Sequence, residues 1–433
     1  MTIDWEIEPV PPTPMTPRRP GPITTRRYRR LRVSRRGLLV AGAVGVAVIV
    51  GVGGAVAIGS GDDTYHRAVA GSRVGQQDPF DIVRPQNVVH VWSNDLSTDP
   101  TELLVNGDDA FVVTPTRVAV FGTDEGRLRW TTDVKNAEPY IAANADTALV
   151  AATGGFEALD RRTGLSRWRV GIDDPADLGR TVGIVHASGT EIAVTSTEHG
   201  GVVGLDATTG AVRWSVTVDG APRGRMAVDE ASGAVALLTA DGEKVALRVL
   251  DAATGTVRWS RTLPRDTGVP TFVGDLLLIG SGRGDSGTLQ AMSAREGDTR
   301  WSLPVDEGFE ATKAPAIEGR RAIFVNLLGT VYSVDARSGT LAWTTHLPSP
   351  ALADSPAIAG GVIVVHDTFA QVHTLDLRTG RILASRGSLG VPVGIGSAPN
   401  RIIYAQTQTQ YGQVMAYAPA VLARPVGAGA PRK

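Results

Sequence analysis

Tryptophan recurs along this chain with a regular spacing. Neighbouring members of the set lie 38 to 46 positions apart, and the set is Trp92, Trp130, Trp168, Trp214, Trp259, Trp301 and Trp343. In six of the seven cases a glycine stands four residues earlier, and the clearest copies, Leu205–Trp214 and Leu250–Trp259, read Leu-Asp-x-x-Thr-Gly-x-x-x-Trp. A further copy keeps the turn but has Ala384 in place of the tryptophan. A period of this length is typical of repeat architectures.

Each repeat reads as short strands joined by tight turns, because short runs rich in β-branched residues are separated by Gly, Asp and Ser. Aspartate at the start of the turn can accept hydrogen bonds from the backbone N–H groups that follow it. The glycine supplies the positive φ that closes the turn. The turn glycines are Gly126, Gly164, Gly210, Gly255, Gly297, Gly339 and Gly380. After the glycine, Val212, Trp214 and Val216 alternate with polar residues, which places the tryptophan on an apolar strand face, docked against the neighbouring repeat.

Four strands in each repeat, arranged radially, predict an all-β fold, an eight-bladed β-propeller, with seven blades possible if one unit is irregular. The strand that ends at Trp92 has no glycine turn before it, while the runs 402–405 and 412–417 supply inner strands without a closing tryptophan strand. We therefore expect the Trp92 strand to complete the last blade. This closure is expected to leave no open sheet edge.

From about Val88 to Tyr417 these repeats resemble the PQQ-like, or quinoprotein-type, propeller family with its tryptophan-docking motif. A WD-repeat fold fits less well, because each of the seven tryptophans is followed by Ser, Thr or Arg and never by Asp. The resemblance implies one of two classes: quinone-dependent dehydrogenases, or scaffolds that bind proteins, such as the eight-bladed outer-membrane protein-assembly lipoprotein.

The chain departs from the enzyme class. It has no cysteine, so it lacks the vicinal disulfide of the alcohol dehydrogenases, and no aspartate with calcium-ligand partners stands at matched positions. We expect the non-catalytic branch and no cofactor. The alternative is pyrroloquinoline quinone with Ca²⁺. Arg180 and Lys313 would then pair with the carboxylate groups of the quinone.

The central channel of a propeller is lined by the innermost strands. Four charged residues at the start of these strands are candidates for channel binding: Arg180, Arg223, Lys313 and Asp354. Their mixed charge suits an anionic or polar ligand, or a solvated rim. His366 and His373 share one predicted hairpin, but a metal would need a third ligand from elsewhere, so we predict no metal site.

Charge divides the chain unevenly. Of 43 basic and 44 acidic residues, nine arginines and three acids lie in 1–36, which leaves the remainder with a net charge of −7. Residues 37–59, uncharged and long enough to cross a bilayer, predict a transmembrane helix. The positive-inside rule then places a disordered, Pro/Arg-rich segment 1–36 in the cytoplasm and the propeller outside it. A polar stalk (60–86), the propeller (87–418) and a flexible tail (419–433) follow.

The N-terminal segment has a second interpretation. Ser34-Arg35-Arg36-Gly37-Leu38-Leu39 resembles a twin-arginine export signal, and 55–57 could be a cleavage site. The length of the apolar run favours an uncleaved, single-pass anchor in the cell membrane. Without cysteine the chain cannot be a lipoprotein.

These features favour a membrane-anchored, extracytoplasmic scaffold that binds an envelope protein or polymer. One alternative is a sensor ectodomain that signals to residues 1–36, and another is a quinone-dependent dehydrogenase. The acidic propeller has no basic patch with interleaved aromatic residues, so nucleic-acid binding is not expected.

Overall fold

The computed structural model describes residues 7–8 and 90–424, except 172–178, 198, 310–313, 352–355, 388–389 and 408–411, and of 179–181 it describes only the backbone. The expected transmembrane helix (37–59), the stalk (60–86), most of the segment 1–36 and the end of the tail lie outside the described residues. None of the helices in the described part of the chain has the length and apolar character that crossing a bilayer requires.

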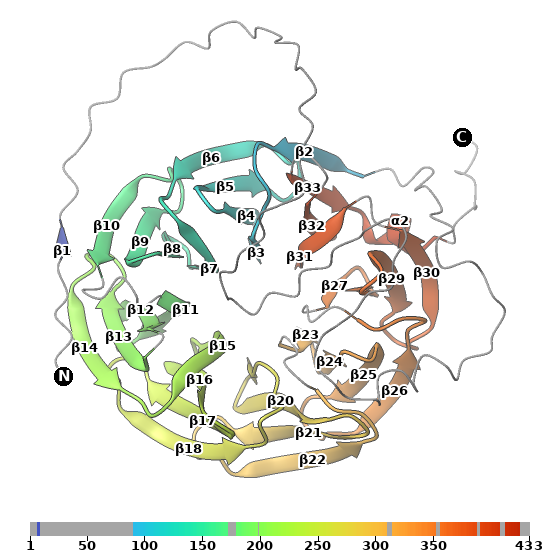
Figure 1. Cartoon of the computed structure of the whole chain (residues 1–433). Coiled ribbons are helices and arrows are strands. Elements are labelled where there is room, and N and C mark those ends of the chain that lie inside the picture. The colour runs from blue at the N-terminus through green and yellow to red at the C-terminus, as the bar shows by residue number, and fades with distance from the viewer. Residues whose placement is uncertain are drawn as a thin grey trace, which may run out of the picture. The chain divides into compact units, whose positions relative to one another are not determined.

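Eight antiparallel sheets form a ring around a central axis (Figure 1). We number the blades 1 to 8 along the chain and call their strands A to D from the axis outward. Because each blade is a simple meander, its A–B and C–D turns lie on one face of the ring, here called the turn face. The B–C turns and the connections between blades lie on the other, here called the loop face.

The strands of blades 1 to 4 are β3 (Glu102–Asn106), β4 (Asp109–Thr114), β5 (Arg117–Gly122), β6 (Leu128–Asp133), β7 (Ala137–Ala143), β8 (Thr147–Ala152), β9 (Gly155–Asp160), β10 (Ser166–Gly171), β11 (Gly179–Ala187), β12 (Thr190–Thr197), β13 (Gly201–Asp206), β14 (Val212–Thr217), β15 (Ala221–Asp229), β16 (Ala234–Asp241), β17 (Lys244–Asp251) and β18 (Val257–Leu263). Those of blades 5 to 8 are β19 (Thr271–Val273), β20 (Leu276–Arg283), β21 (Ser286–Ser293), β22 (Thr299–Val305), β23 (Ala316–Glu318), β24 (Arg321–Val325), β25 (Thr330–Asp335), β26 (Leu341–His346), β27 (Ala357–Ala359), β28 (Val362–His366), β29 (Gln371–Asp376), β30 (Ile382–Gly387), β31 (Val391–Ala398), β32 (Arg401–Thr407), β33 (Gly412–Tyr417) and β2 (Trp92–Leu96).

The ring closes through blade 8, in which β2 from the start of the propeller pairs with β33 from its end, Trp92 opposite Ala416. The eight-bladed prediction is confirmed, and seven blades are excluded. The expectation that closure leaves no open sheet edge was wrong, because the D strand of each blade keeps an outer edge. On blade 2 that edge is occupied by β1 (Ile7–Glu8), which pairs with Val170 and Arg169 of β10. These two residues are thus paired, although they belong to the segment expected to be disordered.

The hydrophobic core is divided among the junctions of the ring. It consists of eight clusters, and each cluster joins side chains of two neighbouring blades. Between blades 2 and 3, for example, Leu149 and Phe156 pack against Ile184 and Leu205. A single blade could not bury its apolar faces alone, so the ring is stable only when its neighbours stack.

The repeat tryptophans connect each blade to the next. Each indole Nε1 donates a hydrogen bond of 2.7–3.2 Å to a backbone carbonyl in the C–D turn of the following blade. The indole ring lies directly over the glycine of that turn, whose φ is +66° to +75°. A Cβ on any of these glycines would approach the ring to 2.3–2.7 Å. Glycine is therefore required twice, once for the backbone conformation and once for the tryptophan.

The turn aspartates complete this unit. Asp160 Oδ1 accepts the backbone N–H of Thr163 at 2.9 Å, and its Oδ2 accepts a hydrogen bond from Arg167 at 2.6 Å. Burial opposes ionisation of Asp160, but these hydrogen bonds outweigh it and lower its pKa to about 2. At Asp335 the backbone N–H of Ser338 and the guanidinium of Arg320 hold the pKa at about 2 as well.

The junction between blades 7 and 8 is built differently. Blade 8 has no C–D turn, because its D strand comes from the other end of the propeller, so a tryptophan at position 384 would have no turn to dock against. A short helix, α2 (Pro419–Leu422), packs there instead, with Leu422 buried in the core between the two blades. Arg386 of β30 donates a hydrogen bond to the carbonyl of Val421 at 3.1 Å. Residues 419–422, assigned above to a flexible tail, are thus a packed part of the propeller.

Candidate functional site

Of the four channel residues proposed from sequence, the structure describes the side chain of Arg223 alone. Arg223 lies in β15, where its guanidinium donates to the carbonyl of Arg265 at 2.9 Å and approaches that of Thr267 at 3.4 Å. Burial lowers the pKa of Arg223. Arg180 lies in β11 with its side chain outside the described residues, and Lys313 and Asp354 lie outside them altogether.

An ion pair crosses the channel. Arg225 of β15, the innermost strand of blade 4, contacts Glu102 of β3, the innermost strand of blade 1. The two strands lie three blades apart around the ring (Figure 1). The Glu102 side chain is only 10% exposed, and its Oε1 accepts the backbone N–H of Leu103 at 3.0 Å. Carboxylate and guanidinium together thus occupy part of the channel that a ligand would otherwise enter.

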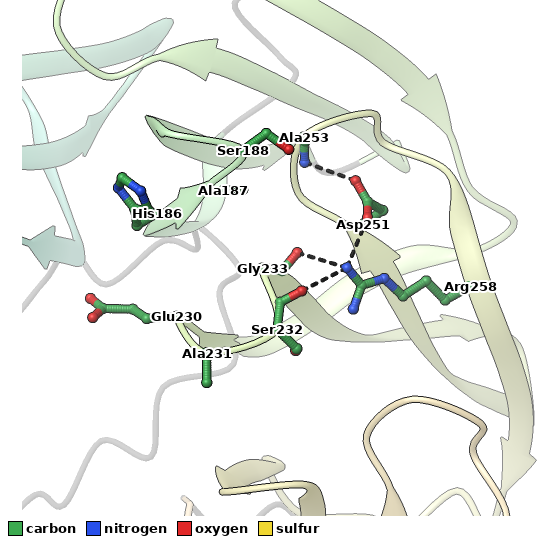
Figure 2. Close-up of a pocket in the computed structure, with 10 residues that line it drawn as sticks. All are labelled: His186, Ala187, Ser188, Glu230, Ala231, Ser232, Gly233, Asp251, Ala253 and Arg258. Atoms are coloured by element: carbon green, nitrogen blue, oxygen red, sulfur yellow. Dashed lines mark hydrogen bonds and ion pairs between the residues drawn. The ribbon is translucent and has the colours of Figure 1, made fainter.

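On the turn face, a hollow of about 240 Å³ lies between the A–B turns of blades 3 and 4 (Figure 2). Arg258 forms one wall. It donates hydrogen bonds to the carbonyls of Ser232 and Gly233 and to Asp251 Oδ2, at 2.8, 3.3 and 2.8 Å. Because the charge of Arg258 is already compensated by these partners, Arg258 supports the wall of the hollow structurally.

A second hollow of about 570 Å³ continues across blades 1 to 3 and shares Glu230 with the first. Arg161 joins blades 1 and 2 here, with an ion pair to Asp109 at 2.8 Å and a hydrogen bond to Asn106 Oδ1 at 3.0 Å. Asn144 then donates to Glu191 Oε2 of blade 3 at 2.8 Å. These polar contacts hold neighbouring blades together, and the two hollows form one polar surface rather than an enclosed pocket.

Blade 7 contains a serine–histidine–aspartate series that the sequence search did not find, in which His373 and Asp367 are buried and Ser385 is half-buried. His373 Nδ1 lies 2.8 Å from Ser385 Oγ, and its Nε2 lies 3.1 Å from Asp367 Oδ2. The His373 and Asp367 side chains are 0% exposed, and Asp367 also accepts two backbone N–H groups of its own turn. A nucleophile would have to present its oxygen to substrate beside an oxyanion-binding group. This series instead fixes the B–C turn of blade 7. The spacing of the three residues in the sequence matches no motif that would have indicated it.

The two histidines of the predicted hairpin are not a ligand pair. His373 pairs with Val365 and therefore shares its face of the sheet. His366 is the next residue after Val365, and successive residues of a strand point to opposite faces, so the two rings lie on opposite faces of blade 7. The His366 ring packs against Tyr404 of blade 8 with centroids 4.6 Å apart. In the described part of the chain no three His, Cys, Asp or Glu residues gather closely enough to hold a metal ion.

An eight-bladed ring joined by tryptophan–glycine docking defines a propeller of the PQQ-like repeat class. The chain belongs to the family described as "Outer membrane protein assembly factor BamB", whose model matches residues 83–248 and 242–393.

Three similar proteins illustrate the relationship. The outer membrane protein assembly factor BamB of Burkholderia pseudomallei is 28% identical over 292 residues, which are 62% of this chain and 72% of that protein. The crystal structure of BamB from Moraxella catarrhalis matches with a TM-score of 0.59 and 21% identity, covering 76% of this chain and 97% of that one, and this likeness shows the fold. A serine/threonine-protein kinase of Streptomyces griseus, AfsK, is 32% identical over 103 residues, 22% of this chain and 12% of the kinase.

Proposed function

We propose that this protein is a non-enzymatic scaffold of the cell envelope that binds another protein through its propeller. The observation that carries the proposal is the match of residues 83–393 to a family of assembly factors. Polar contacts between neighbouring blades, such as Arg161 with Asp109 and Asn144 with Glu191, support a ring that offers one preformed surface to a partner.

The channel supports a binding role over a quinone-dependent reaction. A flat quinone with Ca²⁺ needs an open space along the axis and several oxygen ligands for the metal. Glu102 and Arg225 extend into that space and neutralise each other. The channel residues described do not fit such a cofactor, so we derive no reaction from them.

A titration with pyrroloquinoline quinone and Ca²⁺ tests this part of the proposal. Calorimetry and absorbance spectra of the purified protein should show neither heat of binding nor a bound chromophore. Tight binding near one quinone per ring would replace the scaffold proposal with a dehydrogenase.

We further propose that residues 37–59 anchor the protein with the propeller outside the cytoplasm. The flanking arginines and the uncharged run support this topology. The pairing of β1 with β10 opposes it, because a membrane span would place Ile7 and the propeller on opposite sides of the bilayer.

Cysteine labelling distinguishes the two arrangements, since the chain has no cysteine of its own. In spheroplasts, a membrane-impermeant maleimide should label Thr208→Cys on the propeller directly, but Thr24→Cys only after lysis. Labelling of both positions without lysis would refute the anchor and support the pairing.

The match to the kinase favours a second candidate, a sensor that reports to residues 1–36. Replacing residues 1–30 with an unrelated sequence of equal charge keeps the topology signal. If the cells lose a response that the wild-type protein supports while the variant localises normally, the sensor is supported. If that response is the same with the replaced segment, the sensor is excluded.

A further inference from the structure

Large apolar side chains are exposed at the tips of two neighbouring turns on the loop face. Phe369 is 64% exposed in the B–C turn of blade 7, and Leu328 is 44% exposed in that of blade 6. The other described B–C turns carry small, polar or charged residues at their tips, such as 115–116 in blade 1 and 242–243 in blade 4. The repeat itself does not require an apolar tip, so blades 6 and 7 depart here from the other described blades.

The turn that carries Phe369 is held firmly. Asp367 Oδ1 accepts the backbone N–H groups of Phe369 and Gln371 at 2.9 and 2.7 Å, and its Oδ2 contacts His373 and Ser349. Ala370 has φ +57°, a left-handed conformation that costs a residue with a Cβ about 1 kcal/mol or more. Strained positions persist where the surrounding structure enforces them. The buried Asp367 and His373 thus fix the backbone of the turn that presents Phe369 to solvent.

The two tips belong to one surface, because the connection Leu347–Ala351 touches both turns. Leu347 donates its backbone N–H to the carbonyl of Gly329, the neighbour of Leu328, at 2.8 Å. Three residues on, the carbonyl of Pro350 accepts the N–H of Thr368, the neighbour of Phe369, at 2.9 Å. We call Leu328, Phe369 and this connection the loop-face patch.

Two acidic residues, Asp306 and Glu307, lie beside the turn that carries Leu328. Glu307 accepts a hydrogen bond from Asn326 Nδ2 at 2.7 Å at the base of the turn that carries Leu328. Asp306 beside it is exposed. The exposed ring of His346 lies 3.9 Å from Glu307. The chain beyond residue 36 carries a net charge of −7, which disfavours an anionic lipid surface and favours a basic partner.

We propose that the loop-face patch is the docking site of the partner protein, and that it takes a segment in which an apolar side chain is flanked by lysine or arginine. The apolar side chain packs between Phe369 and Leu328, and the basic residues face Asp306 and Glu307. This inference rests on the proposed function, to which it adds the surface and the chemistry of the partner. A few large side chains near the centre of an interface, often aromatic, carry most of its binding energy.

Photo-cross-linking identifies the segment. The full chain with p-benzoylphenylalanine at position 369 is irradiated in cells, and the cross-linked peptide is sequenced by mass spectrometry. The same probe at Leu165, which is 60% exposed on the turn face of blade 2, is the control. The proposal expects a peptide with an apolar residue flanked by basic residues, cross-linked from 369 and not from 165. Cross-links to lipid alone, or none from 369, would overturn it.

A synthetic copy of the recovered peptide is then titrated into the wild-type full chain, Phe369→Ser and Leu165→Ser. Phe369→Ser should weaken binding about 30-fold or more, because a central aromatic residue contributes about 2 kcal/mol or more. Leu165→Ser should bind as the wild type does, and equal melting temperatures establish that both variants are folded. If both variants bind equally well, the patch is not the docking site. If position 165 cross-links a protein and position 369 does not, the scaffold function remains but uses another face. If neither position cross-links a protein, and general cross-linking of the wild type also recovers none, the scaffold function itself is refuted.

Discussion

Substitution of Gly210 by alanine tests how much the tryptophan–glycine contact stabilises the ring. Alanine at φ +75° costs about 1–2 kcal/mol. Its Cβ would also lie 2.7 Å from the ring of Trp168, which is 2% exposed and donates to the carbonyl of Ala207 at 3.0 Å. Moving the indole costs about 1–3 kcal/mol for strained packing. Weakening its hydrogen bond costs about 1 kcal/mol more. We expect a total loss of about 3–6 kcal/mol.

Gly189→Ala is the matched control. Gly189 has φ +76°, but a Cβ there would meet no atom within 4 Å, so only the backbone cost of about 1–2 kcal/mol remains. In a ring of this size about 1 kcal/mol lowers the melting temperature by about 1–2 °C. Differential scanning calorimetry should therefore show a decrease for Gly210→Ala two to three times that for Gly189→Ala. Equal decreases would refute the claim that indole docking, beyond turn geometry, stabilises the ring.

Three further predictions concern charge and closure. Glu102→Gln should lower the free energy of unfolding by about 1–3 kcal/mol, because it leaves the Arg225 guanidinium without its carboxylate partner. Arg117→Gln, whose ion pair with Asp133 is exposed, should cost less than about 0.5 kcal/mol. Urea denaturation measures both, and similar losses would contradict a special role for the channel pair. The pKa values of Asp160 and Asp335 are about 2 in the folded protein and about 4 in the unfolded chain, so their contribution to stability is present above pH 4 and is lost as the pH falls toward 2. Asp335→Ala should therefore reduce the pH dependence of the free energy of unfolding in that range. An unchanged slope of that free energy against pH would refute the prediction. Removal of residues 419–433 should increase hydrogen exchange in β30 and β33, while removal of 425–433 alone should not; equal protection in both would show that α2 does not hold the last junction.

Much of the fold could be predicted from the sequence because the decisive interactions are local or repeat at a fixed period. The glycine that needs a positive φ stands four residues before the tryptophan in each complete copy, and both requirements are visible in a ten-residue window. The closing strand was predictable from Trp92, which had a strand but no turn. The register shift in the C–D pairs of blades 1 to 7 was not predicted. It occurs beside Ala384 as well as beside the tryptophans and is absent from the blade 8 pair, which has no C–D turn, so it accompanies the turn rather than the indole.

The candidate sites were harder to predict, because they combine residues from different blades. Arg223 was chosen for its place at the start of an inner strand, yet its guanidinium is held by the backbone of the next connection. The residue that reaches across the channel is its neighbour Arg225. A phenylalanine between two strands, at a position where turns are polar, is the one sequence signal that could have identified the loop-face patch.

By itself the sequence determined the repeat and the turn chemistry, because both depend on φ preferences and strand periodicity within about forty residues. It favoured eight blades, and the closed ring excluded seven. Only the tertiary structure decided that Glu102 meets Arg225 across the axis, that α2 replaces a docked tryptophan beside Ala384, and that Phe369 and Leu328 share one surface. These contacts join residues that are near one another only after the ring has closed. No local preference encodes them, since the distance between two blades is determined by all the blades between them.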